Sequence, residues 1–149
     1  MTNWNIYEIF QKEEGFEIDL GFKAFNEEEI ISFAKKNDPL PFHLDPAVAA
    51  ESFFGELVCS GGQAFNFFYV ARFVPLFGST TVGGLGISNW DFLGPIVVNE
   101  KVFAKARCHR LRPSSSNPRL YIAVWVFEFR KSTHELLQKL EIKILHRRS

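Results

Sequence analysis

Apolar and polar residues alternate in the first element that the sequence predicts. Phe16, Ile18, Leu20 and Phe22 are separated by polar or small residues. A period of two places these four side chains on one face of an extended chain. The pattern therefore predicts a β-strand with one buried face.

A helical period replaces the alternation from Asn26 onward. Asn26 is a favoured N-cap residue, and Glu29 three positions later completes a capping-box pattern. The apolar residues that follow recur at the spacing of one helix face: Ile30, Ile31, Phe33 and Ala34. We expect this helix to end near Asn37.

Proline stiffens the next segment, residues 38–46, whose sequence is DPLPFHLDP. A proline removes a backbone donor and biases the residue before it toward extended conformations. The segment therefore predicts a stiff loop. Asp45 and Pro46 then open a second, short helix, because Asp is a favoured N-cap and proline suits the first helical position. We expect this helix to stop near Gly55.

A third helix is predicted from Gly62 to about Phe73. Its sequence is apolar nearly all round, which is typical of a helix buried on most sides. From Thr80 the pattern changes to β, with four strand-like segments at residues 80–93, 96–111, 119–130 and 136–147. This order predicts a single α+β domain over residues 1–149, with an antiparallel sheet around the long helix.

Composition limits the classes of function. The 17 basic and 17 acidic residues give zero net charge, so there is no long-range field to hold nucleic acid or an anionic membrane. No apolar stretch has the length of a membrane span, and the N-terminus lacks a signal-peptide pattern. Cys59 and Cys108 are too few for a disulfide framework and lack metal-ligand spacing. We expect a cytoplasmic protein without a metal.

One pair of residues has the chemistry for acid–base catalysis. Asp38 and His43 lie five positions apart in the proline-stiffened segment. A carboxylate and an imidazole held together can exchange protons with one water molecule, which contributes roughly 10²–10⁴ in rate. The structural alternative is that Asp38 starts a turn before Pro39 and that His43 only packs in an apolar loop. Spacing alone leaves both interpretations open.

The residues before the third helix form a candidate substrate-binding site. Backbone N–H groups at a helix start can polarise a carbonyl, and glycine lets a substrate approach the backbone closely. Ser60, Gly61 and Gly62 are therefore candidates for this role. The simpler interpretation is that Ser60 is an N-cap and the glycines relieve crowding. Cys59 beside them is a candidate nucleophile, but its apolar neighbours favour a buried thiol.

Two further patterns are weaker candidates for a functional site. The glycine-rich run at residues 83–86 does not match a phosphate-binding loop and predicts a bulge or a close backbone contact. Four arginines flank the predicted turn at residues 113–118: Arg107, Arg110, Arg112 and Arg119. They can meet the phosphates of a coenzyme A, although a solvated hairpin end explains most of them.

The segment from Asp38 to Gly61, DPLPFHLDPAVAAESFFGELVCSG, resembles the signature of MaoC-like dehydratases and (R)-specific enoyl-CoA hydratases. In that family an Asp, a Pro three positions on, a His five on and a further Asp form the hydratase loop. A short helix and a small residue–Gly pair follow it. FNEEEIISFAKKND, GGLGISNWDFLGPI and RCHRLRPSSSNPRL also resemble family segments, so the likeness covers nearly the whole chain.

The resemblance implies a hotdog fold and a hydro-lyase that adds water to an enoyl thioester or removes it from a 3-hydroxyacyl thioester. Asp38 and His43 would bind and activate the water, and the Gly61 amide would hold the thioester carbonyl. It implies no cofactor, because coenzyme A or acyl carrier protein is part of the substrate, and it implies a homodimer or larger homo-oligomer. Leu40 stands where many members carry Asn, and Ser60 where hydratases often carry His.

Two alternative functions stay open at this point. The hotdog fold also supports acyl thioesterases, which would release a free thiol, because a fold does not fix a function. A non-catalytic acyl-thioester-binding module would bind without turnover, and Leu40 is the feature that points to it.

Overall fold

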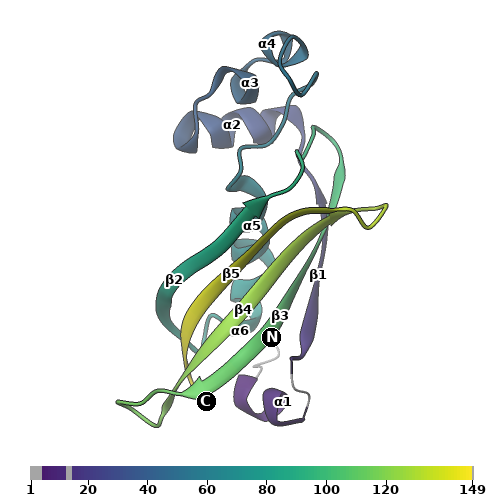
Figure 1. Cartoon of the computed structure of the whole chain (residues 1–149). Coiled ribbons are helices and arrows are strands. Elements are labelled where there is room, and N and C mark those ends of the chain that lie inside the picture. The colour runs from purple at the N-terminus through teal and green to yellow at the C-terminus, as the bar shows by residue number, and fades with distance from the viewer. Residues whose placement is uncertain (1–4, 13–14, 149) are drawn as a thin grey trace.

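The computed structural model describes residues 5–12 and 15–148 (Figure 1). An antiparallel sheet of five strands lies against one long helical segment, and a group of helices stands at one end of the sheet (Figure 1). This arrangement confirms the expected α+β class.

The strands run across the sheet in the order β1-β3-β4-β5-β2. Strands β3, β4 and β5 follow one another along the chain and pair as neighbours. Strand β2 precedes β3 in the chain but pairs with β5. Strands β1 and β2 therefore form the two edges. The bounds are β1 Glu17–Ala24, β2 Thr81–Phe92, β3 Lys101–Pro113, β4 Leu120–Lys131 and β5 Leu136–Arg147.

The helices form two groups. Three stand above one end of the sheet: α2 (Glu27–Asn37), α3 (Pro41–Leu44) and α4 (Pro46–Ala50) (Figure 1). The central segment follows without a break as α5 (Gln63–Phe68), the π-helical η1 (Tyr69–Phe73) and α6 (Val74–Phe77). The segment confirms the long central helix, but the expected burial on most sides is wrong, because Val70, Ala71 and Arg72 are exposed. The π-helical turn η1 ends just before Pro75, which has no backbone N–H to donate.

Aromatic residues fill the space between the central helix and the sheet. The rings of Phe73 and Phe77 each lie 4.9 Å from Trp125 of β4, measured between ring centroids. Phe68 packs on Phe129 in the same way, at 5.8 Å. All five side chains are buried, and each buried ring stabilises the fold by roughly 1.5–3 kcal/mol. The high Phe content of the sequence therefore serves mainly this core.

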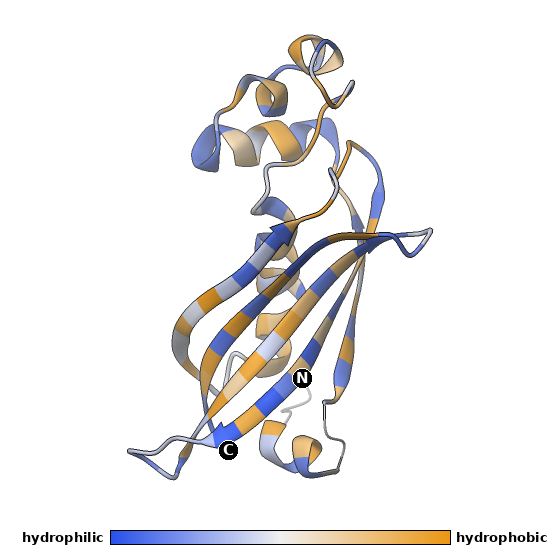
Figure 2. Ribbon diagram, in the orientation of Figure 1, coloured by the Kyte–Doolittle hydropathy of each residue, from blue (hydrophilic) through white to orange (hydrophobic). Residues whose placement is uncertain are grey.

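One face of the sheet is apolar and buried. Hydrophobic and hydrophilic residues alternate along β3 (Figure 2), whereas the first eight residues of β4 are apolar or aromatic. In β3 the buried residues are Val102, Ala104, Ala106 and Cys108, and they alternate with exposed or half-buried ones. Such alternation arises because successive side chains of a strand point to opposite faces.

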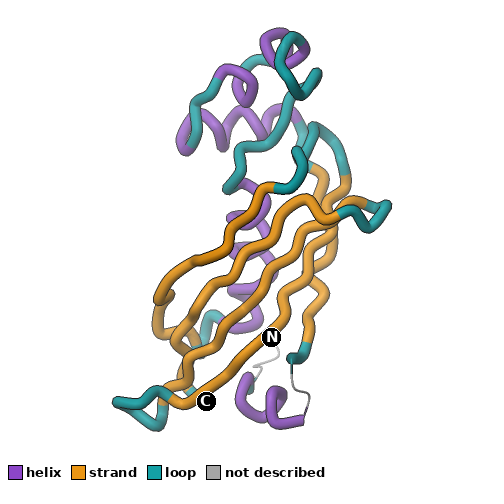
Figure 3. Tube along the Cα trace, in the orientation of Figure 1, coloured by secondary structure: helices purple, strands orange, loops and turns teal. Residues whose placement is uncertain are grey.

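Two loops bring the distant parts of the chain together. The loop from α4 to α5 runs beside the loop that follows β2 (Figure 3). Val58 and Val97 form an antiparallel bridge between the two loops. The Cys59 amide donates to the Ile96 carbonyl at 2.8 Å, and the Val98 amide donates to the Leu57 carbonyl at 2.9 Å. The start of the central helix is thereby fixed against the end of β2.

The structure corrects two of the predicted elements. Residues 41–44 form helix α3 within the expected loop, because Pro41 sits at its first position and its carbonyl accepts from the Asp45 amide at 3.0 Å. Strand β3 begins at Lys101 and not at residue 96, because Val97 and Val98 pair with the loop before α5 and Asn99, with a φ of 62°, turns the chain out of the extended conformation. Helix α1 (Ile6–Lys12) was not predicted.

Candidate active site

Asp38 stands at the C-terminal end of α2. Its amide donates to the Ala34 carbonyl at 2.8 Å, so the helix ends on this residue and its side chain projects beyond the last turn. The carboxylate is about one-third exposed. Helix α2 is fixed at its start by the predicted capping box, in which the Glu29 amide donates to Asn26 Oδ1 at 2.8 Å and the Asn26 amide donates to Glu29 Oε1 at 3.1 Å.

His43 lies on α3 and is buried. Its Nε2 is 3.3 Å from Asp38 Oδ2. Its Nδ1 is 2.7 Å from the carbonyl oxygen of Val58. Because a carbonyl can only accept, the proton of the neutral imidazole sits on Nδ1 and the lone pair of Nε2 faces Asp38. A water molecule beside the pair can donate a hydrogen bond to each of these two acceptors.

Ser60 contacts the same carboxylate oxygen. Its hydroxyl donates to Asp38 Oδ2 at 3.0 Å, across 22 residues of sequence. Within residues 5–12 and 15–148, the side-chain contacts of Asp38 both fall on Oδ2. The second carboxylate oxygen, Oδ1, remains available to a ligand or to water.

The two glycines lie where the central helix begins. Gly62 is the N-cap of α5 and its carbonyl accepts from the Asn66 amide at 3.1 Å. A Cβ atom on Gly61 would lie 2.8 Å from Cε1 and 2.9 Å from Cζ of the Phe92 ring. Glycine is therefore required at position 61 for the ring to pack this closely on the backbone. Among the described residues, no protein acceptor engages the Gly61 amide.

One cavity of ≈ 830 Å³ contains all five residues that the sequence predicted for the site. Most of its wall is apolar, a composition typical of a pocket for an organic ligand. The lining residues are Asp38, His43, Ser60, Gly61 and Gly62 with Phe33, Asn37, Phe42, Phe54, Val58, Cys59, Trp90, Phe92, Leu93, Gly94, Pro95, Ile96 and Gln138.

Sequence reasoning missed the wall that β2 supplies. Trp90 and Phe92 stack with ring centroids 5.5 Å apart, and the Trp90 indole donates to Gln138 Oε1 at 3.4 Å. Phe92 remains 59% exposed although it lines the cavity. Two aromatic residues near the end of a strand are visible in the sequence, but only the fold places Phe92 against Gly61.

The candidate thiol lines this cavity but is not ionised near neutral pH, and the four arginines lie outside it. Burial raises the pKa of Cys59 to about 12, with a smaller contribution from the charge of Glu29, so the thiol stays protonated near neutral pH. The turn between β3 and β4, which the arginines flank, lies at the opposite end of the sheet from α2, α3 and α4 (Figure 1). Within one chain those arginines do not reach the site.

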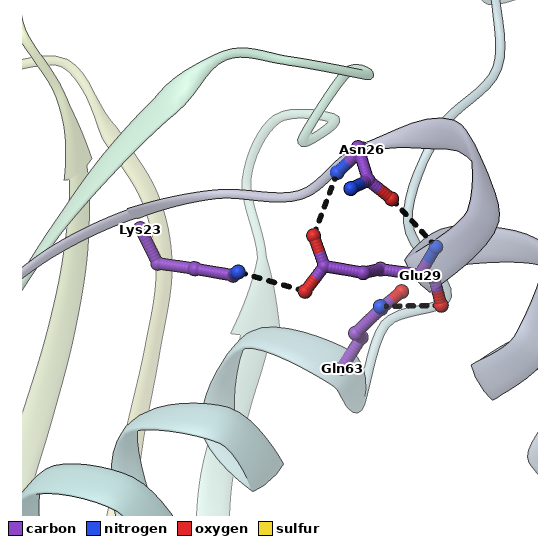
Figure 4. A network of polar contacts seen from close by, with 4 residues as sticks. All are labelled: Lys23, Asn26, Glu29 and Gln63. Atoms are coloured by element: carbon purple, nitrogen blue, oxygen red, sulfur yellow. Dashed lines mark hydrogen bonds and ion pairs between the residues drawn. The ribbon is translucent and has the colours of Figure 1, made fainter.

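A polar network ties β1, α2 and α5 together beside the cavity (Figure 4). Lys23 Nζ lies 2.7 Å from Glu29 Oε2, and the buried Gln63 side chain donates to the Glu29 carbonyl at 3.1 Å. Burial alone would raise the pKa of Glu29. The Lys23 and Asn26 hydrogen bonds and the Lys23 charge together lower it.

No group of three or more His, Cys, Asp and Glu side chains that could hold a metal ion is found among the described residues. The same part of the chain contains no helix long and apolar enough to cross a membrane. The side chains that line the cavity include a carboxylate, an imidazole, a hydroxyl, a thiol and two carboxamides.

Neither a sequence-family model nor a curated protein matches this chain. Several solved structures do. The (R)-hydratase from A. caviae involved in PHA biosynthesis is 27% identical, with a TM-score of 0.70 over 87% of this chain and 93% of its own. The chain therefore has the hotdog fold of MaoC-like dehydratases and (R)-hydratases. A MaoC-like dehydratase from Rhodospirillum rubrum superposes with a TM-score of 0.79 at 24% identity, over 91% of this chain and 92% of its own.

The chain also superposes on the HadBC (3R-hydroxyacyl-ACP dehydratase) complex from Mycobacterium tuberculosis. The TM-score is 0.73 at 16% identity, over 88% of this chain and 95% of the other. The sheet wrapped on a central helix is the architecture that the family resemblance implied, so the expected hotdog fold is confirmed.

Proposed function

We propose that this protein catalyses reversible hydration of an enoyl thioester to a 3-hydroxyacyl thioester. The observation that carries the proposal is the position of Asp38 and His43, which face each other across 3.3 Å at the wall of an apolar cavity. The named activities of the hydratase and dehydratase structures that share the fold support the same class of reaction.

The proposed mechanism begins with a water molecule held between Asp38 and His43. The pair removes one proton from the water as its oxygen forms a bond to the β-carbon. The electrons of the carbon–carbon double bond move toward the thioester oxygen, and the Gly61 amide stabilises the enolate that results. The pair then returns the proton to the α-carbon, so the enzyme ends in its starting state. Dehydration follows the same steps in reverse.

The proposal needs no cofactor and no metal. The acyl group is carried by coenzyme A or by acyl carrier protein, and the carrier enters and leaves as part of the substrate. The apolar wall, with Phe33, Phe42 and Phe54, fits an acyl chain. A cytoplasmic location, expected from the sequence, remains a prediction.

We also propose that the working unit is a homodimer or larger homo-oligomer. Strand β2 is an edge strand that carries one charged residue, Asp91, among its twelve. Val82, Leu85 and Ile87 are about half exposed along it. An uncharged, apolar edge strand is a template for pairing with another strand, and a second copy of the chain supplies one.

The test is to incubate the purified protein with crotonyl-CoA and with a medium-chain trans-2-enoyl-CoA. Hydration removes the enoyl absorbance without releasing thiol. Release of free thiol at unchanged double-bond content would instead support a thioesterase. Saturable binding with neither change would support a binding module without turnover.

A further inference from the structure

Ser60 is buried between the bridge at Val58 and the start of the central helix. Its hydroxyl donates to Asp38 Oδ2 at 3.0 Å, and the same oxygen lies 3.3 Å from His43 Nε2. An ionised carboxylate only accepts hydrogen bonds, so the proton of this contact comes from the Ser60 hydroxyl. Such charge-assisted hydrogen bonds are stronger than neutral ones.

The hydroxyl is not used to cap the helix. The N-cap of α5 is Gly62, and no side chain forms a cap hydrogen bond there. The N-cap interpretation of Ser60, left open by the sequence, is therefore wrong, and its hydroxyl is directed to the carboxylate of α2.

The backbone that carries this hydroxyl is held on both sides. The Ser60 carbonyl accepts from the Gln63 amide at 3.1 Å, and the preceding Cys59 amide donates to the Ile96 carbonyl at 2.8 Å. Asp38, in contrast, follows the last turn of α2 and its carboxylate is about one-third exposed. Because the Ser60 hydroxyl is held in place, its hydrogen bond restricts the rotation of the partly exposed Asp38 carboxylate.

Resting on the proposed hydratase function, we propose that Ser60 is a positioning residue for Asp38. Its hydroxyl holds Oδ2 beside His43 and thereby presents Oδ1 to the reacting water. This role differs from contact with the thioester carbonyl, which the sequence suggested for Ser60, because the hydroxyl proton is directed to the catalytic pair.

The test compares Ser60→Ala and Ser60→Thr with the wild-type protein in the enoyl-CoA hydration assay. Loss of one hydrogen bond to a charged group lowers kcat by about 10- to 100-fold in Ser60→Ala. Ser60→Thr keeps a hydroxyl and recovers kcat to within about 5-fold of wild type. The affinity for butyryl-CoA, a saturated thioester that does not react, changes by less than about 3-fold, because Ser60 does not hold the carbonyl.

Ser52→Ala is the matched control. The Ser52 hydroxyl donates to the Ala49 carbonyl at 2.6 Å within the α4 segment and has no contact with Asp38. Its removal leaves kcat unchanged, and urea unfolding shows whether each variant is folded.

Three outcomes overturn the inference, and they are distinguishable. An active wild type whose kcat is unaffected by Ser60→Ala rules out the positioning role and leaves the proposed function intact. A folded Ser60→Ala variant that loses butyryl-CoA affinity, with kcat preserved, assigns Ser60 to the carbonyl. A wild type without hydratase activity removes the proposed function and this inference with it.

Discussion

The chemistry of the cavity depends on which proton each side chain carries. The Val58 carbonyl fixes the His43 proton on Nδ1, so Nε2 is the ring atom that meets Asp38. The Ser60 hydroxyl occupies the other side of the same carboxylate oxygen. The proposed acid–base pair, Asp38 and His43, is thus oriented by groups from the loop between α4 and α5.

The sequence could predict these catalytic candidates but not their partners. Asp38, His43 and Gly61 follow from residue type, spacing and the family resemblance. The partner of Ser60 lies 22 residues away, and Phe92 of β2 lies against Gly61. Contacts of this kind depend on the tertiary fold, which no local pattern encodes.

At residue 61 we predict that Gly61→Ala lowers kcat/KM by about 10- to 100-fold while leaving the protein folded. The added Cβ would lie 2.8 Å from the Phe92 ring, and this half-exposed ring can shift aside. Activity falls because the methyl group blocks the approach of the thioester to the Gly61 amide. Steady-state kinetics and urea unfolding measure the two effects. We expect the loss of activity to persist in the double variant Gly61→Ala/Phe92→Ala. Full recovery of activity in the double variant would mean that the clash with the Phe92 ring alone caused the loss.

A second residue-scale prediction concerns His146, which is buried away from the cavity. The Trp125 indole donates to His146 Nε2 at 3.1 Å, so the imidazole proton sits on Nδ1, 3.3 Å from Thr80 Oγ1. Burial lowers the pKa of His146 to about 4. The unfolded chain, with its pKa near 6.5, therefore binds more protons than the folded one between these two values.

Stability is therefore expected to be full above pH 6.5 and to fall by up to roughly 3 kcal/mol as the pH drops from about 6.5 to about 4. Urea unfolding at pH 7, 5.5 and 4.5 measures this change. His146→Gln cannot take up the proton, so its stability should vary less over the same range. An equal pH dependence in that variant would assign the effect to other groups.

At the scale of elements, α2 carries Asp38 at one end and its capping box at the other. Gln63 and Lys23 hold the capped end against α5 and β1 (Figure 4). Ser60 holds the other end through Asp38. The orientation of the Asp38 carboxylate therefore depends on how α2 sits on the central helix.

We predict that Glu29→Ala lowers the free energy of unfolding by about 1 kcal/mol, because it removes the reciprocal cap contact and the partner of Lys23. Glu29→Gln keeps the cap hydrogen bond and should lose less. Because the pKa of Glu29 is lowered in the fold, its contribution is present above pH 4.5 and is lost as the pH falls below it. Urea unfolding of both variants at neutral pH checks the order; an equal loss would show that the cap contributes nothing.

Local patterns predicted the elements well where one period dominates. The capping box at Asn26, the start of the short helix at Pro46 and the last strand, Leu136–Arg147, appear in the structure as expected, but the short helix ends at Ala50 and not near Gly55. Helix α3 was missed because two nearby prolines suggested an extended segment. The start of β3 was placed too early because apolar residues continue through 96–98, where the chain bridges to Val58.

At the scale of the whole molecule, the two sheet edges differ in chemistry. Strand β1 carries Glu17, Asp19 and Lys23, which discourage pairing with another strand. Strand β2 has only Asp91 and contributes Trp90 and Phe92 to the cavity wall. A second copy paired with β2 would therefore lie next to the proposed active site.

We predict that Ile87→Lys weakens self-association, because it places a charge on the half-exposed apolar edge of β2. Sedimentation velocity at several concentrations should show a homo-oligomer for the wild type and a smaller species for the variant. Asp19→Lys on β1, the opposite edge, is the control and should leave the assembly unchanged. A wild-type monomer at all concentrations would contradict the oligomer.

The central claim is that Asp38 and His43 together hydrate an enoyl thioester, and the most direct measurement is the hydration rate of crotonyl-CoA by wild type, Asp38→Asn and His43→Ala. Each substitution removes one half of the acid–base pair and should lower kcat by at least about 100-fold with the fold retained. We expect the wild type to form the (R)-3-hydroxyacyl product. Hydration that survives both substitutions in folded variants would contradict the claim.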